Sequence, residues 1–338
     1  MTRNRSLRWR TALIAWLAVT AVGWSAGGEA AAEVRLPRPG RIAGADRYAQ
    51  AVEASRSVFS GSSLVYLASG ESFPDALSAA SVAGVRESPL LLVPHDRAPD
   101  GVVAEIRRLR AEVAVVVGGR SSIDDEVLIA LSRQLPGVIV SRVQGADRYA
   151  TSRTLLVDPL AGAPDAGSLT LATGADFPDA LAAASPAARR GAPVLLLSSE
   201  ASDPAGADAM FLRGFAPDAT VIVGGPRSIT PEAEATLGMI APASRLSGAD
   251  RYATAVAVSR HAYASARTVY LTSGTGFADA LSGGPVAAHA AAPLLVVRPD
   301  CVPGTVRAEL ERLAPDRIVL LGGTASLGAA VERLETCP

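Results

Sequence analysis

The chain of 338 residues contains one sequence unit three times, and this repetition restricts its fold more than any other feature. Block 1, Arg41–Ala49, recurs at 142–150 and 245–253. Three further blocks follow it in the same order in every copy: block 2 from Ser69, block 3 from Pro89 and block 4 from Val117 in the first copy. Because about 100 residues can bury a core of their own, each copy is predicted to be a domain rather than one turn of a solenoid.

Within one copy, short apolar runs alternate with amphipathic stretches. The runs predict buried parallel strands, because they are continuous and rich in Val and Leu. In the first copy they are 64–67, 90–93 and 113–117, with a further short strand at 41–43, and the helices are expected at 48–58, 75–85, 102–109 and 126–135. The alternation predicts three tandem doubly wound, Rossmann-like α/β domains. Whether the strand at 41–43 joins the copy before or after it is left open by the sequence.

Residues at the ends of the predicted helices support these boundaries. Asp46 and its two copies stand where an N-cap is needed, and Pro74 fits the first position of the next helix. Beyond block 4, Asp124 is an acceptable N-cap, and the paired glycines of that block permit positive φ in a tight turn between strand and helix.

The first 32 residues are typical of a secretory signal peptide. They begin with four arginines, continue with an uncharged run from Thr11 to Gly28 and end in three alanines. A retained membrane anchor is the alternative. We therefore expect the organisation 1–32 signal peptide, 33–140 repeat 1, 141–244 repeat 2 and 245–338 repeat 3.

Composition and charge exclude several classes of protein. Hydrophobic residues make up 49% and charged residues 19%, which excludes a disordered chain. The formal net charge of −1 becomes −4 without residues 1–32, which hold four arginines and one glutamate, so nucleic-acid binding is not expected. The only two cysteines, Cys301 and Cys337, predict a disulfide in an exported protein.

The repeated polar residues fall after predicted strands and before helices, at the edge where parallel sheets bind ligands. They are the candidate ligand-binding residues Asp46, Arg47, Tyr48, Asp75, Asp147, Arg148, Tyr149, Asp179, Asp250, Arg251, Tyr252 and Asp279. The candidate anion loops are Gly118, Gly119, Gly224, Gly225, Gly322 and Gly323. Arginine forks and helix N-termini together suit phosphate or carboxylate. Structural roles are an equal alternative: Asp46 as a helix cap, Phe73 in the core and Arg47 paired with Asp75.

The sequence gives little support for a catalytic function. The three histidines, His95, His261 and His289, occupy non-equivalent positions, and no metalloprotease, serine-hydrolase or P-loop motif occurs. We expect no cofactor, no metal site and no catalytic residue, although the repeated pairs such as Asp46 and Asp75 leave a wall hydrolase as an alternative.

The four blocks closely resemble the cell wall binding repeat 2 family. They read R-[IVL]-x-G-A-D-R-Y-A, G-x-x-F-[PA]-D-A-L, P-[LV]-L-[LV] and [VL]-G-G, and three copies cover the chain from about Arg41 to its end. The resemblance implies a surface protein of Gram-positive bacteria that binds anionic wall polymers non-covalently. It also implies a threefold-like arrangement of the domains, with ligand near their junctions. Some members carry an amidase label, but nothing here resembles an amidase zinc site.

The leading hypothesis is therefore a secreted wall-binding protein whose partner is an anionic glycopolymer or a peptidoglycan-associated polymer. We expect no membrane contact after signal cleavage and no accompanying enzymatic domain; the oligomeric state is left open. Because the net charge is negative, binding must be local or bridged by a cation. Half of the rings that remain after residue 32 belong to the repeated blocks, which favours polar or ionic recognition over broad aromatic platforms. An amidase-type hydrolase and an extracellular protein-interaction scaffold are the alternatives.

Overall fold

A computed structural model describes residues 35–338, and the expected signal peptide lies outside the described residues. Three four-stranded parallel sheets form in this part of the chain. The first contains β2 (Leu64–Ser69), β3 (Leu90–Val93), β4 (Val113–Val117) and β5 (Ile139–Val143). The second contains β6 (Ser168–Thr173), β7 (Val194–Leu197), β8 (Ala219–Val223) and β9 (Ala243–Leu246). The third contains β10 (Thr268–Ser273), β11 (Leu294–Val297), β12 (Arg317–Leu321) and β1 (Gly40–Ile42).

All three sheets have the same strand order, β3-β2-β4-β5 in the first, and every pair is parallel. β2 and β3 are buried along their whole length, as continuous apolar runs require. This architecture confirms the predicted α/β class with three doubly wound domains.

The strand of block 1 joins the sheet of the preceding copy, which answers the question that the sequence left open. β5 carries block 1 of the second copy and pairs with β4 of the first. β9 pairs in the same way with β8. β1, which carries block 1 of the first copy, instead pairs with β12 of the third, with Gly40 opposite Val319 and Ile42 opposite Leu321. The beginning of the described chain therefore completes the last sheet.

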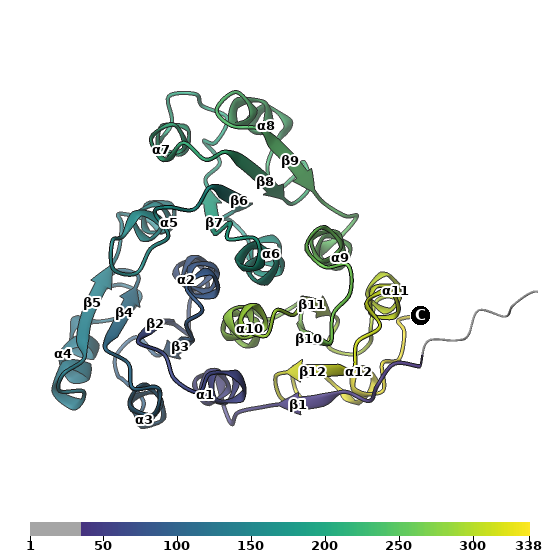
Figure 1. The fold of residues 1–338 in the computed structure, drawn as a ribbon, viewed down its shortest axis with the longest axis horizontal. Helices are drawn as coiled ribbons and strands as arrows, with labels where there is room; N and C mark the ends of the chain where they lie inside the picture. Colours follow the sequence, from purple (N-terminus) through teal and green to yellow (C-terminus); the bar gives the residue numbers. More distant parts are fainter. Residues whose placement is uncertain (1–34) are drawn as a thin grey trace, which may run out of the picture. The chain divides into compact units, whose positions relative to one another are not determined.

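The helices fall into three groups by position (Figure 1). One helix from each copy lies at the centre: α2 (Pro74–Val85), α6 (Pro178–Arg189) and α10 (Ala278–His289). The seam helices pack against the central helix of the preceding copy: α1 (Arg47–Val58), α5 (Arg148–Val157) and α9 (Arg251–Ala262). The remaining helices cover the outer faces: α3 (Asp100–Leu109), α4 (Asp125–Gln134), α7 (Ala207–Phe215), α8 (Pro231–Gly238), α11 (Gly304–Leu313) and α12 (Ala329–Glu332).

Small side chains let the three central helices approach one another closely. A Cβ placed on Gly84 would lie 2.9 Å from the Cβ of Ala188 and 3.2 Å from that of Ala288. One turn away, a Cβ on Gly284 would lie 3.2 Å from that of Ala184. These distances leave no room for larger side chains, and they place one face of each central helix on the pseudo-threefold axis.

The predicted caps are present and explain where the helices begin. The carboxylate of Asp46 accepts hydrogen bonds from the backbone N–H groups of Tyr48 and Ala49, and its two copies cap α5 and α9 through one N–H group each. Asp124 caps α4, and Pro74 opens α2.

The predicted disulfide joins Cys301 and Cys337. Beside it, Val302 forms a parallel bridge with Thr336, and the N–H of Cys337 donates to the carbonyl of Val302. The end of the chain is thus attached to the loop after β11. Among residues 35–338, no helix combines the length and the apolar character that a membrane crossing needs.

Replacing Gly84 tests the packing of the central helices. We expect Gly84→Leu to lower the free energy of unfolding by about 1–3 kcal/mol, because the added atoms meet Ala188 and Ala288. Gly214→Leu in α7 is the matched control, since a Cβ there meets nothing within 4 Å. Urea unfolding of both variants measures the difference, and equal stability would contradict the proposed close packing.

Removing the disulfide tests the attachment of the chain end. In the chain-entropy view, closing a loop with a sequence separation of 36 contributes about 3–4 kcal/mol. We expect the double variant Cys301→Ala/Cys337→Ala to lose about this amount of unfolding free energy in denaturant titration. A reducing agent should have a comparable effect on the wild type and none on the double variant.

Candidate functional site

Blocks 2 and 4 meet at the point where the strand order of each sheet reverses. In the first sheet, β2 and β4 are neighbours, and block 2 follows β2 while block 4 follows β4. This position at the carboxyl edge is the usual ligand site of an open α/β sheet. Gly118 has φ of +118°, and a Cβ on it would lie 2.5 Å from an oxygen of Asp75. Glycine is therefore needed there so that the block 4 loop can lie against the carboxylate.

The second-block aspartates are half-buried and fixed by a serine of block 4. The hydroxyl of Ser122 donates to Asp75, and that of Ser228 donates to Asp179, both over 2.8 Å. Ser326 lies in the same relation to Asp279. Burial raises the pKa of all three carboxyls, although the serine hydrogen bonds oppose the shift.

The block 1 arginines lie at the junction with the preceding copy. The guanidinium of Arg148 lies 5.6 Å from the ring centre of Phe73, and its charge lowers the pKa of Asp75. Arg251 has the same relation to Phe177 and Asp179, and Arg47 acts on Asp279. The expected pairing of Arg47 with Asp75 in one copy is therefore wrong, because α1 packs against α10 of the third repeat.

Each of these arginines is also held by its own copy. Arg148 donates to the carbonyl oxygen of Gly174 over 2.8 Å, and Arg251 donates to that of Gly274 over 2.6 Å. Arg47 donates to Gly70 in the same way. The arginines are therefore oriented at the junction before any ligand arrives.

The block 1 tyrosines pack on the glycine at the second position of block 2. A Cβ on Gly70 would lie 2.7 Å from the ring of Tyr48, and the copies Tyr149 and Tyr252 lie equally close to their glycines. The hydroxyl of Tyr48 reaches Glu71 at 3.4 Å. The structure thus gives these rings a packing role beside the junction.

The candidate anion loops divide into two kinds of glycine. The first glycine of each block 4 donates its N–H to the following edge strand, as Gly118 does to the carbonyl of Val143. The second glycines, Gly119, Gly225 and Gly323, have no positive φ and leave room beside their Cα atoms. Any contact of these loops with an anion rests on the second glycine.

Two of the junctions are hollow. Where repeat 3 meets repeat 1, a pocket of about 520 Å³ is lined by Asp46, Arg47 and Asp279 among others. Where repeat 2 meets repeat 3, a pocket of about 280 Å³ is lined by Asp179 and Arg251 among others. The aspartates of blocks 1 and 2 therefore converge from different repeats, across a junction, rather than within one copy.

Three phenylalanines of block 2 meet beside the junctions. The ring centres of Phe73, Phe177 and Phe277 lie 5.7, 5.9 and 6.1 Å apart, in tilted or edge-on contact. Each ring stands at the start of a central helix. Their meeting connects the three junctions around one axis.

Sequence reasoning missed the role of the first arginine of block 1. Arg142 donates to the carbonyls of Gly118 and Ile123 over 2.6 and 2.8 Å and thereby fixes the block 4 loop. Arg245 holds the second loop in the same way, and Arg41 holds the third across the ring closure. The signal was available, because this arginine stands in all three copies.

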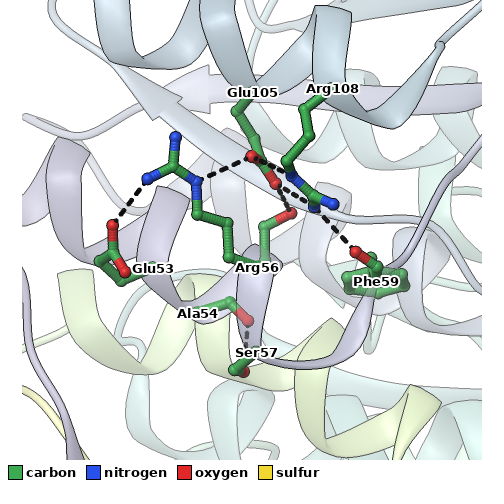
Figure 2. A network of polar contacts seen from close by, with 8 residues as sticks. Glu53, Ala54, Arg56, Ser57, Phe59, Glu105 and Arg108 are labelled. Carbon is green, nitrogen blue, oxygen red and sulfur yellow. Dashed lines mark hydrogen bonds and ion pairs between the residues drawn. The ribbon is translucent and has the colours of Figure 1, made fainter.

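A buried acid that joins the seam and outer helices was also missed (Figure 2). Glu105 of α3 is fully buried and accepts hydrogen bonds from Ser55, Arg56 and Arg108. Burial alone would raise the pKa of this carboxyl, but these hydrogen bonds outweigh it and lower the pKa. Glu309 forms the same kind of hydrogen-bond network in the third copy. In the second copy, the pair of Asp208 and Arg153 takes the place of this network. This network stabilises the fold away from the junctions.

The three histidines lie outside the junction pockets just described. His289 contacts Phe59 with a ring-centre distance of 4.4 Å, and His261 lines an apolar cavity beneath the second sheet. Within residues 35–338, no three His, Cys, Asp or Glu side chains are grouped to hold a metal ion.

The buried carboxylates predict a dependence of stability on pH. Since burial raises the folded pKa of Asp179 above the value of about 3.9 for an unfolded chain, the folded state binds this proton more tightly. The stability contributed by the group is fully present below pH 3.9 and is lost as pH rises through the folded pKa. We expect Asp179→Asn to gain stability relative to the wild type as pH rises from about 4 to 7.

Urea unfolding at a series of pH values measures this difference. Ser228→Ala is a second test variant, because it removes a hydrogen bond that lowers the pKa of Asp179. It should therefore widen the pH range over which this stability is lost. Parallel pH profiles for the wild type and Asp179→Asn would contradict the assignment.

Comparison with known proteins agrees with this architecture. The profile of cell wall binding domain 2 (CWB2) matches residues 41–128, 142–234 and 245–332. The chain is 28% identical over 296 residues to the amidase enhancer of Bacillus subtilis (strain 168), covering 86% of this chain and 39% of that protein. It is 24% identical over 291 residues to N-acetylmuramoyl-L-alanine amidase LytC of the same organism, covering 86% of this chain and 56% of that protein.

A solved structure supports the same fold. Cwp6 from Clostridium difficile matches with a TM-score of 0.79 at 23% identity, covering 89% of this chain and 48% of that chain. The chain thus spans about half the length of its relatives or less, and at this identity the structural match shows the fold alone. The three matched segments contain the blocks that form the junctions, and the chain belongs to the cell wall binding domain 2 family, with three such domains in tandem.

Proposed function

We propose that the three repeats bind an anionic glycopolymer of the cell wall non-covalently, through the junctions between neighbouring repeats. One observation carries this proposal. At every junction a pre-oriented arginine of one repeat lies beside the half-buried aspartate of the preceding repeat, next to the glycine loop of block 4. Cell wall binding domains imply a location at the cell surface.

The chemistry of the junction suits an anion that also carries hydroxyl groups. Arginine forks bind phosphate and carboxylate well, and the N–H of the second glycine adds a donor. The aspartates supply acceptors for hydroxyl groups of the same ligand. Three sites on one rigid chain multiply a weak single-site affinity for a repetitive polymer.

The acidic net charge restricts how such a polymer binds. At −4 for the residues after 32, the field of the whole chain repels an anionic wall, so attraction must come from the junction arginines at short range. A divalent cation between junction carboxylates and polymer is the other route. The two modes of binding respond differently to solution conditions. High salt weakens a direct arginine contact, and a chelator weakens only a cation bridge.

Export and attachment complete the proposal. Residues 1–32 would serve as the signal peptide, and the remainder would stay on the outside of a Gram-positive cell through its repeats. The exported chain would then meet the oxidising conditions in which the Cys301–Cys337 disulfide persists.

The hydrolase alternative assigns acid–base work to the aspartates. The structure gives them other tasks, since Asp46 caps α1 and Asp75 accepts a hydrogen bond from Ser122. The alternative would require that the chain release sugar or peptide products from purified walls and that Asp75→Asn stop this release without unfolding. The scaffold alternative would require capture of a protein instead of a polymer from an extracellular fraction.

Charge reversal at one junction tests polymer binding. Arg227 is exposed and lines the pocket between repeats 2 and 3. We expect Arg227→Glu to weaken binding to purified walls about tenfold, which corresponds to the loss of about 1.4 kcal/mol from one charged contact. Arg133→Glu on the exposed side of α4 is the control, because it changes the net charge equally without touching a junction.

The measurement is a pull-down on walls before and after extraction of their anionic polymers. Wild-type binding should fall after extraction and with rising salt. Equal binding to extracted walls, or equal weakening by Arg133→Glu and Arg227→Glu, would contradict the proposal.

A further inference from the structure

The three junctions share a central set of residues but differ around it. Asp, Arg and Ser recur at each one, whereas the positions beside them change. Three positions of the second repeat, Asp176, Pro178 and Arg227, correspond to Gly276, Ala278 and Ala325 in the third. The first residues line the junction between repeats 2 and 3, and their smaller counterparts line the junction between repeats 3 and 1.

These smaller side chains give the junction between repeats 3 and 1 its greater volume. Its pocket of about 520 Å³ lies within the range of roughly 300–1,000 Å³ typical of small-molecule sites, whereas the pocket of about 280 Å³ between repeats 2 and 3 falls just below that range. The larger pocket has room for a complete ring, which a contact with a single phosphate does not need.

The polar lining of the larger pocket also contains more hydroxyl groups and fewer arginines than that of the smaller one. Around it stand hydroxyl groups of Ser273, Thr275 and Ser326, together with the backbone of three glycines. Arg47 is the one arginine among its lining residues. Neutral donors and acceptors with a single cation suit an uncharged, hydroxyl-rich ligand better than a phosphate.

The other two junctions each place a second arginine beside the glycine loop. Arg227 and Arg251 line the pocket between repeats 2 and 3. At the junction of repeats 1 and 2, Arg120 follows Gly119 directly and pairs with Asp125 at 2.8 Å. Thr324 and Ala325 occupy these loop positions in the third repeat, so its junction lacks that second positive charge.

An aromatic ring completes the larger pocket. Phe277 is half-buried and contributes to the lining of this pocket. Two carboxylates, of Asp46 and Asp279, line the same pocket. A sugar ring presents an apolar C–H face to such a ring while its hydroxyl groups donate to carboxylates, and both features are present here.

We infer that the junction between repeats 3 and 1 binds an uncharged sugar unit of the polymer, while the other two junctions bind its charged groups. This inference rests on the proposed wall-polymer function and assigns different parts of one ligand to different junctions. The polymer would then bind in a defined register, with its neutral unit against Phe277.

Nuclear magnetic resonance with neutral sugars tests the assignment directly. The probes are glucose and N-acetylglucosamine, added to the ¹⁵N-labelled protein, with inorganic phosphate as the charged probe. We expect the sugars to shift the amides of Gly44, Gly276 and Gly323 at the larger pocket. Phosphate should shift the amides of Gly119 and Gly225 at the other two junctions.

A double variant gives the larger pocket two of the three side chains that distinguish the smaller one. Gly276→Asp with Ala325→Arg introduces the residues of the second repeat, and a Cβ on Gly276 meets nothing within 4 Å, so the fold has room for it. The sugars are expected to bind this variant at least about tenfold more weakly. Gly214→Asp on α7 is the control for an added carboxylate away from every junction, and it should leave sugar binding unchanged.

The possible outcomes separate this inference from the proposed function. Sugar shifts at all three junctions alike, at none of them, or undiminished in the double variant would overturn the inference. Phosphate binding as tightly at the larger pocket as at the other junctions would also overturn it. Wild-type protein that fails to bind whole walls would contradict the proposed function instead, whatever the sugars do.

Discussion

The close contact of three small-residue helix faces is the interaction on which the rest of the structure depends. Gly84 stands where any side chain would collide with Ala188 and Ala288, and the next turn repeats the arrangement with Gly284. Because α2, α6 and α10 approach this closely, the phenylalanines at their N-terminal ends come within about 6 Å of one another. The block 2 aspartates follow two residues later, so the same contact places each of them at a junction.

The second constraint is that no repeat completes its own sheet. Each sheet takes its edge strand from block 1 of the next repeat, and β1 closes the ring on β12. The arginine of that strand fixes the block 4 loop of the sheet it joins, as Arg142 does at Gly118. A junction therefore exists only when neighbouring repeats are assembled. Strand exchange, loop geometry and the junction form one cooperative unit, because the residue that joins the sheet also shapes the loop.

Local physics was sufficient to predict the elements and their ends. The strand 113–117 and the helix beginning near Asp75 follow from apolar runs and caps, which depend on neighbouring residues alone. The partner of a parallel strand depends on the path of the whole chain, so the pairing of β1 with β12 could not be predicted from the sequence. The central packing was hidden for another reason: α6 is rich in alanine on every side, and its sequence does not mark one face for burial. Arg47 illustrates the consequence, since its expected partner Asp75 belongs to its own repeat, whereas the arginine acts on Asp279 of the third repeat.

Repetition in a chain of this kind identifies the residues that every copy needs, and these are first of all structural. Asp46 caps a helix, Tyr48 packs on a glycine and Arg47 is held by a carbonyl, so each would recur even without a ligand. Discrimination between parts of a ligand cannot come from residues that are identical at all three junctions. It must come from positions that differ, such as Gly276 and Ala325, which alter the volume and charge of one junction without disturbing its frame. The repeated residues thus build three comparable junctions, and under the proposed function the variable residues around them would decide what each junction accepts.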